Sequence, residues 1–185
     1  MFKQIPIISA KRKLSELQKL PTGTVDAADK RYENVIVQLF ASVFYPHLDF
    51  ADSQARTDSG VLIRDLIFYN NKNLPFLEDI YNKYDCRQIV MELKNVKSLD
   101  REHVNQLNRY LSESFGRFGI LVTRNEPPKN VQKNLIDLWS GQRKCILVLT
   151  DADVDLMVNL FESKQRLPIE VINRAFVEFM RKCPS

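Results

Sequence analysis

Two stretches of sequence decide the fold of this chain: VLIRDLIFYN at residues 61–70 and RQIVMELKNV at residues 87–96. Each is rich in β-branched and aromatic side chains, follows a polar or turn-prone segment, and is too short to form a buried helix. We therefore predict a β-strand at each stretch. Residues 118–124 (FGILVTR) and the apolar run 145–150 (CILVLT) predict two further strands.

Charged residues interrupt the first two predicted strands. In a strand alternate residues share a face, so Glu92 and Lys94 project together from the second stretch. In the first stretch Asp65 shares its face with Ile63 and Ile67, where a buried charge requires compensation. If the two strands pair with these faces coinciding, two carboxylates and one ammonium group lie close together.

Apolar residues at helical spacing predict helices around these strands. The predicted helices cover residues 9–20, 29–45, 99–115, 127–139 and 168–181, with one more after Thr150. We interpret residues 71–86, which include Pro75 and repeated asparagines, as an irregular loop with a helical turn. The order of elements predicts one α/β domain at residues 29–185. An N-terminal arm at residues 1–28 precedes it, with a short helix that either packs on the body or contacts a partner.

The composition limits the classes of function. The chain has 185 residues, 44% of them hydrophobic, and a formal net charge of +4, so we expect one substantial core and no massively basic surface. Its three cysteines are far apart and form no C-x-x-C pair, which argues against a disulfide framework or a zinc site. The N-terminal residues 1–21 have no apolar run long enough to span a membrane or to be cleaved as a signal, and we expect a cytoplasmic protein without a membrane partner.

Further polar residues accompany the strand residues. Glu33 shares a helical face with apolar residues such as Ile36, so an acidic group stands where a buried stripe begins. Gln106 and Tyr110 are four residues apart and are thus adjacent on one face of a predicted helix. Three of the features have a plain structural alternative: an exposed ion pair for Glu92 and Lys94, a satisfied core aspartate for Asp65, and a first-turn glutamate favoured by the helix dipole for Glu33. The pair of Gln106 and Tyr110 is weak evidence by itself.

These residues follow one another in a fixed order on helix, strand, strand and helix: Glu33, Asp65, Glu92-Leu93-Lys94 and Gln106-x-x-x-Tyr110. The ordered set, within about residues 30–150, resembles the restriction-endonuclease-like, or PD-(D/E)xK, nuclease superfamily, including the Q-x-x-x-Y feature of its RecB-like branch. The resemblance implies a restriction-endonuclease-like core, a central mixed β-sheet flanked by α-helices. The proline of the motif is absent, because Arg64 precedes Asp65, and this leaves the subfamily open.

The resemblance also implies a role for each residue. Asp65 and Glu92 would be metal ligands, together with the Leu93 carbonyl and with Glu33 assisting, Lys94 would orient or activate the attacking water, and Gln106 and Tyr110 would line the site. Oxygen ligands of this kind suit Mg²⁺, with Mn²⁺ as a substitute. Whether Lys94 is a general base stays open.

The leading hypothesis is a metal-dependent DNA endonuclease of a restriction or phage-defence type. RNA or nucleotide processing stays open, and the alternative from another class is an inactive nucleic-acid-binding or scaffolding domain. Basic residues near the site-bearing elements are candidate phosphate contacts: Arg64, Lys97, Arg109 and, favoured among them, Arg124. A homodimer would cut both strands of a duplex, and further domains of a longer parent protein would supply recognition.

Overall fold

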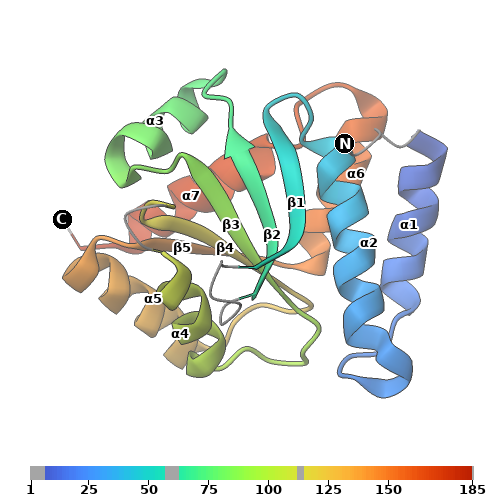
Figure 1. The fold of residues 1–185 in the computed structure, drawn as a ribbon, viewed down its shortest axis with the longest axis horizontal. Helices are drawn as coiled ribbons and strands as arrows, with labels where there is room; N and C mark the ends of the chain where they lie inside the picture. Colours follow the sequence, from blue (N-terminus) through green and yellow to red (C-terminus); the bar gives the residue numbers. More distant parts are fainter. Residues whose placement is uncertain (1–6, 57–62, 112–114, 185) are drawn as a thin grey trace.

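The computed structural model describes residues 7–56, 63–111 and 115–184, and within them five strands form one sheet in the order β1-β2-β3-β4-β5 (Figure 1). The strands are β1 (Leu48–Arg56), β2 (Ile63–Asn70), β3 (Gln88–Lys94), β4 (Phe118–Thr123) and β5 (Cys145–Leu149). The pairs β1–β2 and β2–β3 are antiparallel, whereas β3–β4 and β4–β5 are parallel. The predicted α/β fold with a central mixed sheet is confirmed.

Helices cover both faces of this sheet (Figure 1). They are α1 (Ile7–Lys19), α2 (Ala28–Val43), α3 (Pro75–Tyr84), α4 (Arg101–Tyr110), α5 (Lys129–Gln142), α6 (Asp151–Ser163) and α7 (Glu170–Lys182). The larger core joins the sheet to α1, α2, α3, α6 and α7, and the smaller core joins it to α4 and α5. The molecule therefore has three layers, with the sheet in the middle.

Strand β3 contributes to both cores because its side chains alternate between the two faces. Met91 and Leu93 lie in the larger core, and Val90 lies in the smaller one. Glu92 is two residues from Val90, so it projects to the side of α4 and α5. The alternation thus places a carboxylate at the edge of a packed apolar layer.

The structure differs from the sequence predictions at two elements. Residues 71–86 contain the helix α3, in which Pro75 occupies the first turn, where a missing N–H costs no hydrogen bond. Its apolar residues, including Leu77 and Ile80, are buried. Strand β1 was not predicted, because its sequence LDFADSQAR lacks the apolar character of a central strand; it pairs only with β2, at the edge of the described sheet.

The other elements follow the predictions, with shifted ends. The helix predicted at 99–115 ends at Tyr110, since Leu111 is extended; residues 112–114 of that prediction lie outside the described residues. Residues 61 and 62 of the first predicted strand also lie outside them. The helix after Thr150 is α6, and Thr150 and Asp153 form its capping box.

Helix α1 packs on the body of the protein. Leu14 and Leu17 belong to the larger core, and α1 contacts α2 and α6. Of the two roles considered for the N-terminal helix, packing on the body is therefore the one observed; the division of the chain at residue 28 stays a prediction. Among the described residues, no helix is long and apolar enough to cross a membrane.

Candidate active site

Asp65 and Glu92 lie side by side at one end of the sheet. The register of the antiparallel β2–β3 pair sets Leu66 opposite Met91, so the next residues along, Asp65 and Glu92, stand on the same face. Asp65 turns a carboxylate oxygen towards β3, where its Oδ2 accepts a hydrogen bond of 2.8 Å from the Leu93 backbone N–H. This bond ties the Asp65 side chain to the backbone of β3.

Glu92 is fully buried, with an exposed fraction of 0%. Its Oε1 accepts hydrogen bonds from Lys94 Nζ at 2.7 Å and from Gln106 Nε2. Its Oε2 is buried as well and has no hydrogen-bond partner among the residues that the structure describes. A buried carboxylate oxygen without a partner is costly, and such groups are characteristic of sites that bind something.

Burial and mutual repulsion hold both carboxylates in an unusual state. Burial, reinforced by the charge of Asp65, raises the pKa of Glu92 to about 7, against the lowering effect of Lys94. Burial also raises the pKa of Asp65, although the Leu93 N–H and Lys94 act in the opposite direction. A cation placed between the two carboxylates would relieve this repulsion.

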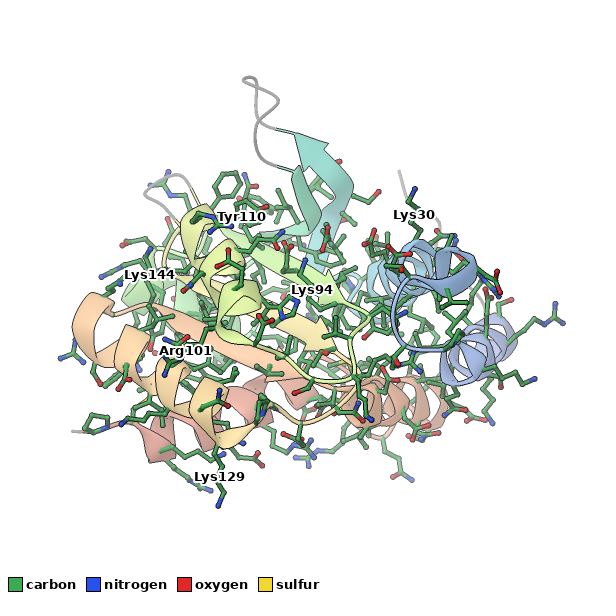
Figure 2. The ribbon with its side chains drawn as sticks, turned by 90° about the horizontal axis from the view of Figure 1, so that it is seen from below. Lys30, Lys94, Arg101, Tyr110, Lys129 and Lys144 are labelled. Carbon is green, nitrogen blue, oxygen red and sulfur yellow. The ribbon has the colours of Figure 1, made fainter. Side chains whose placement is uncertain are left out.

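Gln106 and Tyr110 reach the same place from α4. Asp100 caps the start of this helix by accepting from the N–H groups of Glu102 and His103, which fixes the direction of the helix over the sheet. The Gln106 amide nitrogen lies between Glu92 and the Tyr110 hydroxyl, which is 3.4 Å away. Figure 2 shows Lys94 at the end of the sheet and Tyr110 on neighbouring α4. Both residues of the pair therefore stand beside the candidate site, as predicted; their roles stay predictions.

Glu33 approaches from the opposite layer. It lies in α2, which packs against β3, and its negative charge adds to the rise of the Glu92 pKa. Among the described residues, no three His, Cys, Asp or Glu side chains group together to hold a metal ion. No such group joins Glu33 to Asp65 and Glu92 in the described part of the chain, and the assisting role of Glu33 stays a prediction.

The predicted phosphate contacts have different surroundings. Arg124 is not on the open surface: its side chain is 9% exposed and its Nε lies 2.7 Å from Asp151 Oδ2, so the expectation of a phosphate contact does not fit it. Lys97 is exposed, and so is Arg109, whose guanidinium pairs with Glu102 at 3.1 Å. The side chain of Arg64 lies outside what the structure describes.

Comparison with known proteins agrees with this geometry. Residues 65–135 match the model of the PD-(D/E)XK nuclease superfamily, a span that begins at Asp65 and includes Glu92, Lys94, Gln106 and Tyr110. Over these residues the chain is similar to that superfamily. The resemblance seen in the sequence is thus confirmed at the level of the superfamily.

A protein of Escherichia coli (strain K12) named as a transposon gamma-delta 80.3 kDa protein is 28% identical to the chain over 112 residues. The alignment covers 60% of this chain but only 16% of that protein. The chain therefore matches about a sixth of the length of this curated relative. No solved structure matches the chain.

The residues present fit a divalent cation. PD-(D/E)XK nucleases generally use divalent metal ions. In proteins Mg²⁺ is usually bound by one or two carboxylates, with waters and substrate phosphates completing its shell, so a third acidic ligand is not required. Asp65, Glu92 and the Leu93 carbonyl would supply the protein ligands, and the free Glu92 Oε2 is an oxygen available for this purpose.

Sequence reasoning missed one residue of this region. Asn95 directly follows Lys94 and is 5% exposed, with its side chain bonded to the segment between α1 and α2. A buried asparagine at the end of an apolar strand was the available signal, because such an amide requires several partners.

Proposed function

We propose that this chain is a metal-dependent nuclease that hydrolyses phosphodiester bonds in DNA, cutting as an endonuclease with Mg²⁺ as its ion. The observation that carries the proposal is Glu92: fully buried, repelled by Asp65, and with one oxygen lacking a partner among the described residues. A surface ion pair has none of these properties. The name of the transposon-related relative favours DNA over RNA as the substrate.

The chemistry assigns a task to each side chain. A divalent ion, when bound, would supply an activated water and offset the charge that develops on the phosphate. Lys94 lies 2.7 Å from Glu92 Oε1 and is 18% exposed, so its ammonium group reaches from the buried carboxylate towards the substrate side, where it would orient the attacking water. Gln106 fixes Glu92, and Tyr110 lies next to Gln106.

One observation favours the alternative, an inactive nucleic-acid-binding or scaffolding domain. Glu92 Oε1 is already occupied by Lys94 and Gln106, and the described residues hold no three-residue metal group. In that reading the site is a closed structural cluster. The two functions differ in one outcome, which is turnover.

The test is a cleavage assay with supercoiled plasmid, single-stranded DNA and RNA, each with Mg²⁺, Mn²⁺ or EDTA. The proposal predicts nicking or linearisation of the plasmid with Mg²⁺, none with EDTA, and none with the variant Glu92→Gln. Binding without cleavage under all conditions would support the inactive domain instead. Preferred cleavage of RNA would indicate an RNA-processing nuclease instead. If linear DNA is degraded and closed circular DNA stays intact, the protein is an exonuclease.

The biological setting is a restriction or phage-defence role, with cytoplasmic residence. A homodimer, or further domains in a longer parent protein, would supply recognition of the target. Light scattering of the purified chain, alone and with a DNA duplex, measures whether two copies assemble.

A further inference from the structure

A cluster of polar side chains lies at the carboxyl ends of the three parallel strands. We call it the Arg124 cluster; it consists of Tyr32, Asn95, Arg124 and Asp151. Asn95 follows the end of β3, Arg124 follows the end of β4, and Asp151 begins α6 just after β5. The cluster therefore sits next to Lys94 but is separate from the acidic site.

Asn95 ties the end of β3 to the connection between α1 and α2. Its Nδ2 donates to the backbone oxygens of Pro21 at 2.9 Å and Gly23 at 2.8 Å. In return, the Gly23 N–H donates to the Asn95 carbonyl at 2.7 Å. Asn95 is thus joined to this connection by both its side chain and its backbone.

Arg124 contacts Asn95 and three further groups. Its Nη1 donates to Asn95 Oδ1 at 3.2 Å, its Nη2 donates to the Leu20 carbonyl at 3.1 Å, and its Nε lies 2.7 Å from Asp151. The guanidinium carbon lies 5.3 Å from the centre of the Tyr32 ring, whose hydroxyl is 3.4 Å from Asp151 Oδ1. Each nitrogen of the guanidinium group is therefore engaged inside the protein.

The segment that these residues hold is strained. Asp26 and Ala27 have φ values of 51° and 56°, the left-handed region that residues with a β-carbon rarely adopt. The Thr24 side chain makes no capping hydrogen bond at the start of the short 3-10 turn Val25–Ala27. A strained backbone persists where its surroundings hold it in place, and here Asn95 and Arg124 supply contacts on its N-terminal side.

We propose that Asn95 and Arg124 are positioning residues that hold the start of α2, and with it Glu33, against the end of β3 beside Glu92 and Lys94. Tyr32, which Arg124 contacts, is the neighbour of Glu33 in α2. The inference rests on the proposed nuclease function, because Glu33 has a task only if the site turns over. Without the cluster, β2 and β3 keep the strand residues in place, whereas Glu33 loses its fixed distance from them.

The experiment compares Asn95→Ala with a matched control, Asn70→Ala. Asn70 is also buried at the end of a strand, and its Nδ2 also donates to two backbone carbonyls, those of Leu77 at 2.9 Å and Cys86 at 3.0 Å. It lies at the end of β2, which runs antiparallel to β3, so it is at the opposite end of the sheet from Asn95. The two substitutions remove similar hydrogen bonds. Asn95 holds the connection between α1 and α2, whereas Asn70 holds α3 and the start of β3.

Two readouts are measured on the full chain, both on well-folded protein. Hydrogen exchange of residues 20–33 should be at least about tenfold faster in Asn95→Ala and unchanged in Asn70→Ala, with β3 protected in both. Turnover of plasmid should fall about tenfold in Asn95→Ala with little change in KM, and should be unchanged in Asn70→Ala. In a Glu33→Gln background, Asn95→Ala should lower turnover little further, because both substitutions affect the same interaction.

The outcomes separate this inference from the function on which it rests. Unchanged exchange at residues 20–33 in Asn95→Ala overturns the positioning role, whether or not the protein cleaves. Equal losses of turnover in Asn95→Ala and Asn70→Ala, or additive losses of Asn95→Ala and Glu33→Gln, overturn it as well, since both are the marks of a purely structural residue. Failure of the parent protein to cleave any substrate overturns the nuclease function, while the exchange data still report on the contact itself.

Discussion

Two polar groups of residues lie at the same end of the sheet and are built in opposite ways. In the Arg124 cluster a buried guanidinium pairs with the partly buried carboxylate of Asp151, and each nitrogen of Arg124 has a partner inside the protein. In the acidic site two carboxylates stand together, and Glu92 Oε2 lacks a partner among the described residues. The first group holds segments of the chain together, and the second keeps bonding capacity for a ligand.

The difference has a physical origin in how each group offsets desolvation. A buried ion pair compensates its own burial through Coulomb attraction and hydrogen bonds. Arg124 opposes the effect of burial on Asp151, whose pKa is still raised to about 6. Among the described residues Lys94 is the cation that Asp65 and Glu92 share, and burial raises the pKa of both. Active sites commonly tolerate such local cost because it is recovered when substrate and cofactor bind.

The largest expected effect is on turnover in Lys94→Ala. If Lys94 orients the attacking water, its removal should lower the turnover number by about a hundredfold or more, with metal and nucleic-acid binding nearly intact. Plasmid cleavage under single-turnover conditions measures the effect, and anisotropy with labelled DNA measures binding. An exposed ion pair would instead leave cleavage at the level of the parent and change stability by no more than about 1 kcal/mol.

The second effect concerns stability at the Arg124 cluster. Arg124→Met leaves the partly buried Asp151 without its cation. Removal of one partner of a fully buried pair costs about 3–5 kcal/mol of unfolding free energy, and we expect a loss below that range because Asp151 is 22% exposed. Urea denaturation measures this loss. The double variant Arg124→Met with Asp151→Asn should recover part of it, because no uncompensated charge remains. Equal stability of parent and Arg124→Met would show that the cluster does not hold this end of the sheet.

Much of this molecule was predictable from its sequence because the sheet centre has a local signal. The strand stretches are apolar on both faces, and the odd charged residues Asp65 and Glu92 stand out against them. Alternation then places these two carboxylates on the faces that pairing brings together, which the β2–β3 register bears out in the structure.

What the sequence did not predict depends on contacts between distant segments. Edge strand β1 has little apolar pattern of its own and is defined by its pairing with β2. Arg124 was expected to face phosphates, since a basic residue at a strand end has no local sign that Asp151 and Leu20 will bury it. Long-range partners of this kind are set by the fold and not by residue spacing.

A third prediction concerns how much the acidic site lowers the folding stability of the protein in the absence of metal. The pKa of Glu92 in the folded protein is about 7, above its ordinary value of 4.5, so the folded state binds this proton more tightly than the unfolded state. Stability from this group is therefore full below pH 4.5 and is lost as the pH rises to 7. In EDTA, Glu92→Gln should be more stable than the parent by about 1–3 kcal/mol at pH 8, with the difference vanishing near pH 4.5.

Thermal melting of both proteins across this pH range measures the difference. Asp151→Asn offers the comparison. Burial raises the pKa of Asp151 to about 6 although Arg124 lies 2.7 Å away, and the substitution leaves Arg124 without its partner, so any gain in stability at pH 8 should be smaller than that of Glu92→Gln. If Glu92→Gln is less stable than the parent at pH 8, the charge of Glu92 is well compensated in the folded protein and the prediction is wrong.

The smallest expected effect is on the affinity for DNA, and it concerns the exposed Lys97 in contrast to the engaged Arg124. Lys97 is exposed three residues beyond Lys94, so its ammonium group is free to approach a phosphate, whereas Arg124 is engaged inside the protein. Each phosphate contact releases about one counterion from duplex DNA, so Lys97→Ala should weaken binding about five- to tenfold near 0.1 M salt and reduce the salt slope by about 0.9. Anisotropy measured at several salt concentrations, in the Lys94→Ala background to prevent cleavage, gives both quantities.

Lys83→Ala is the control of equal charge, since Lys83 pairs with Asp79 in α3, which leads into β3 at the end opposite Lys94. An equal loss in both variants would indicate an effect of net charge alone, and no change in the slope for Lys97→Ala would remove Lys97 from the binding surface. A smaller change in Arg109→Ala than in Lys97→Ala is expected, because the pair with Glu102 already offsets part of the Arg109 charge.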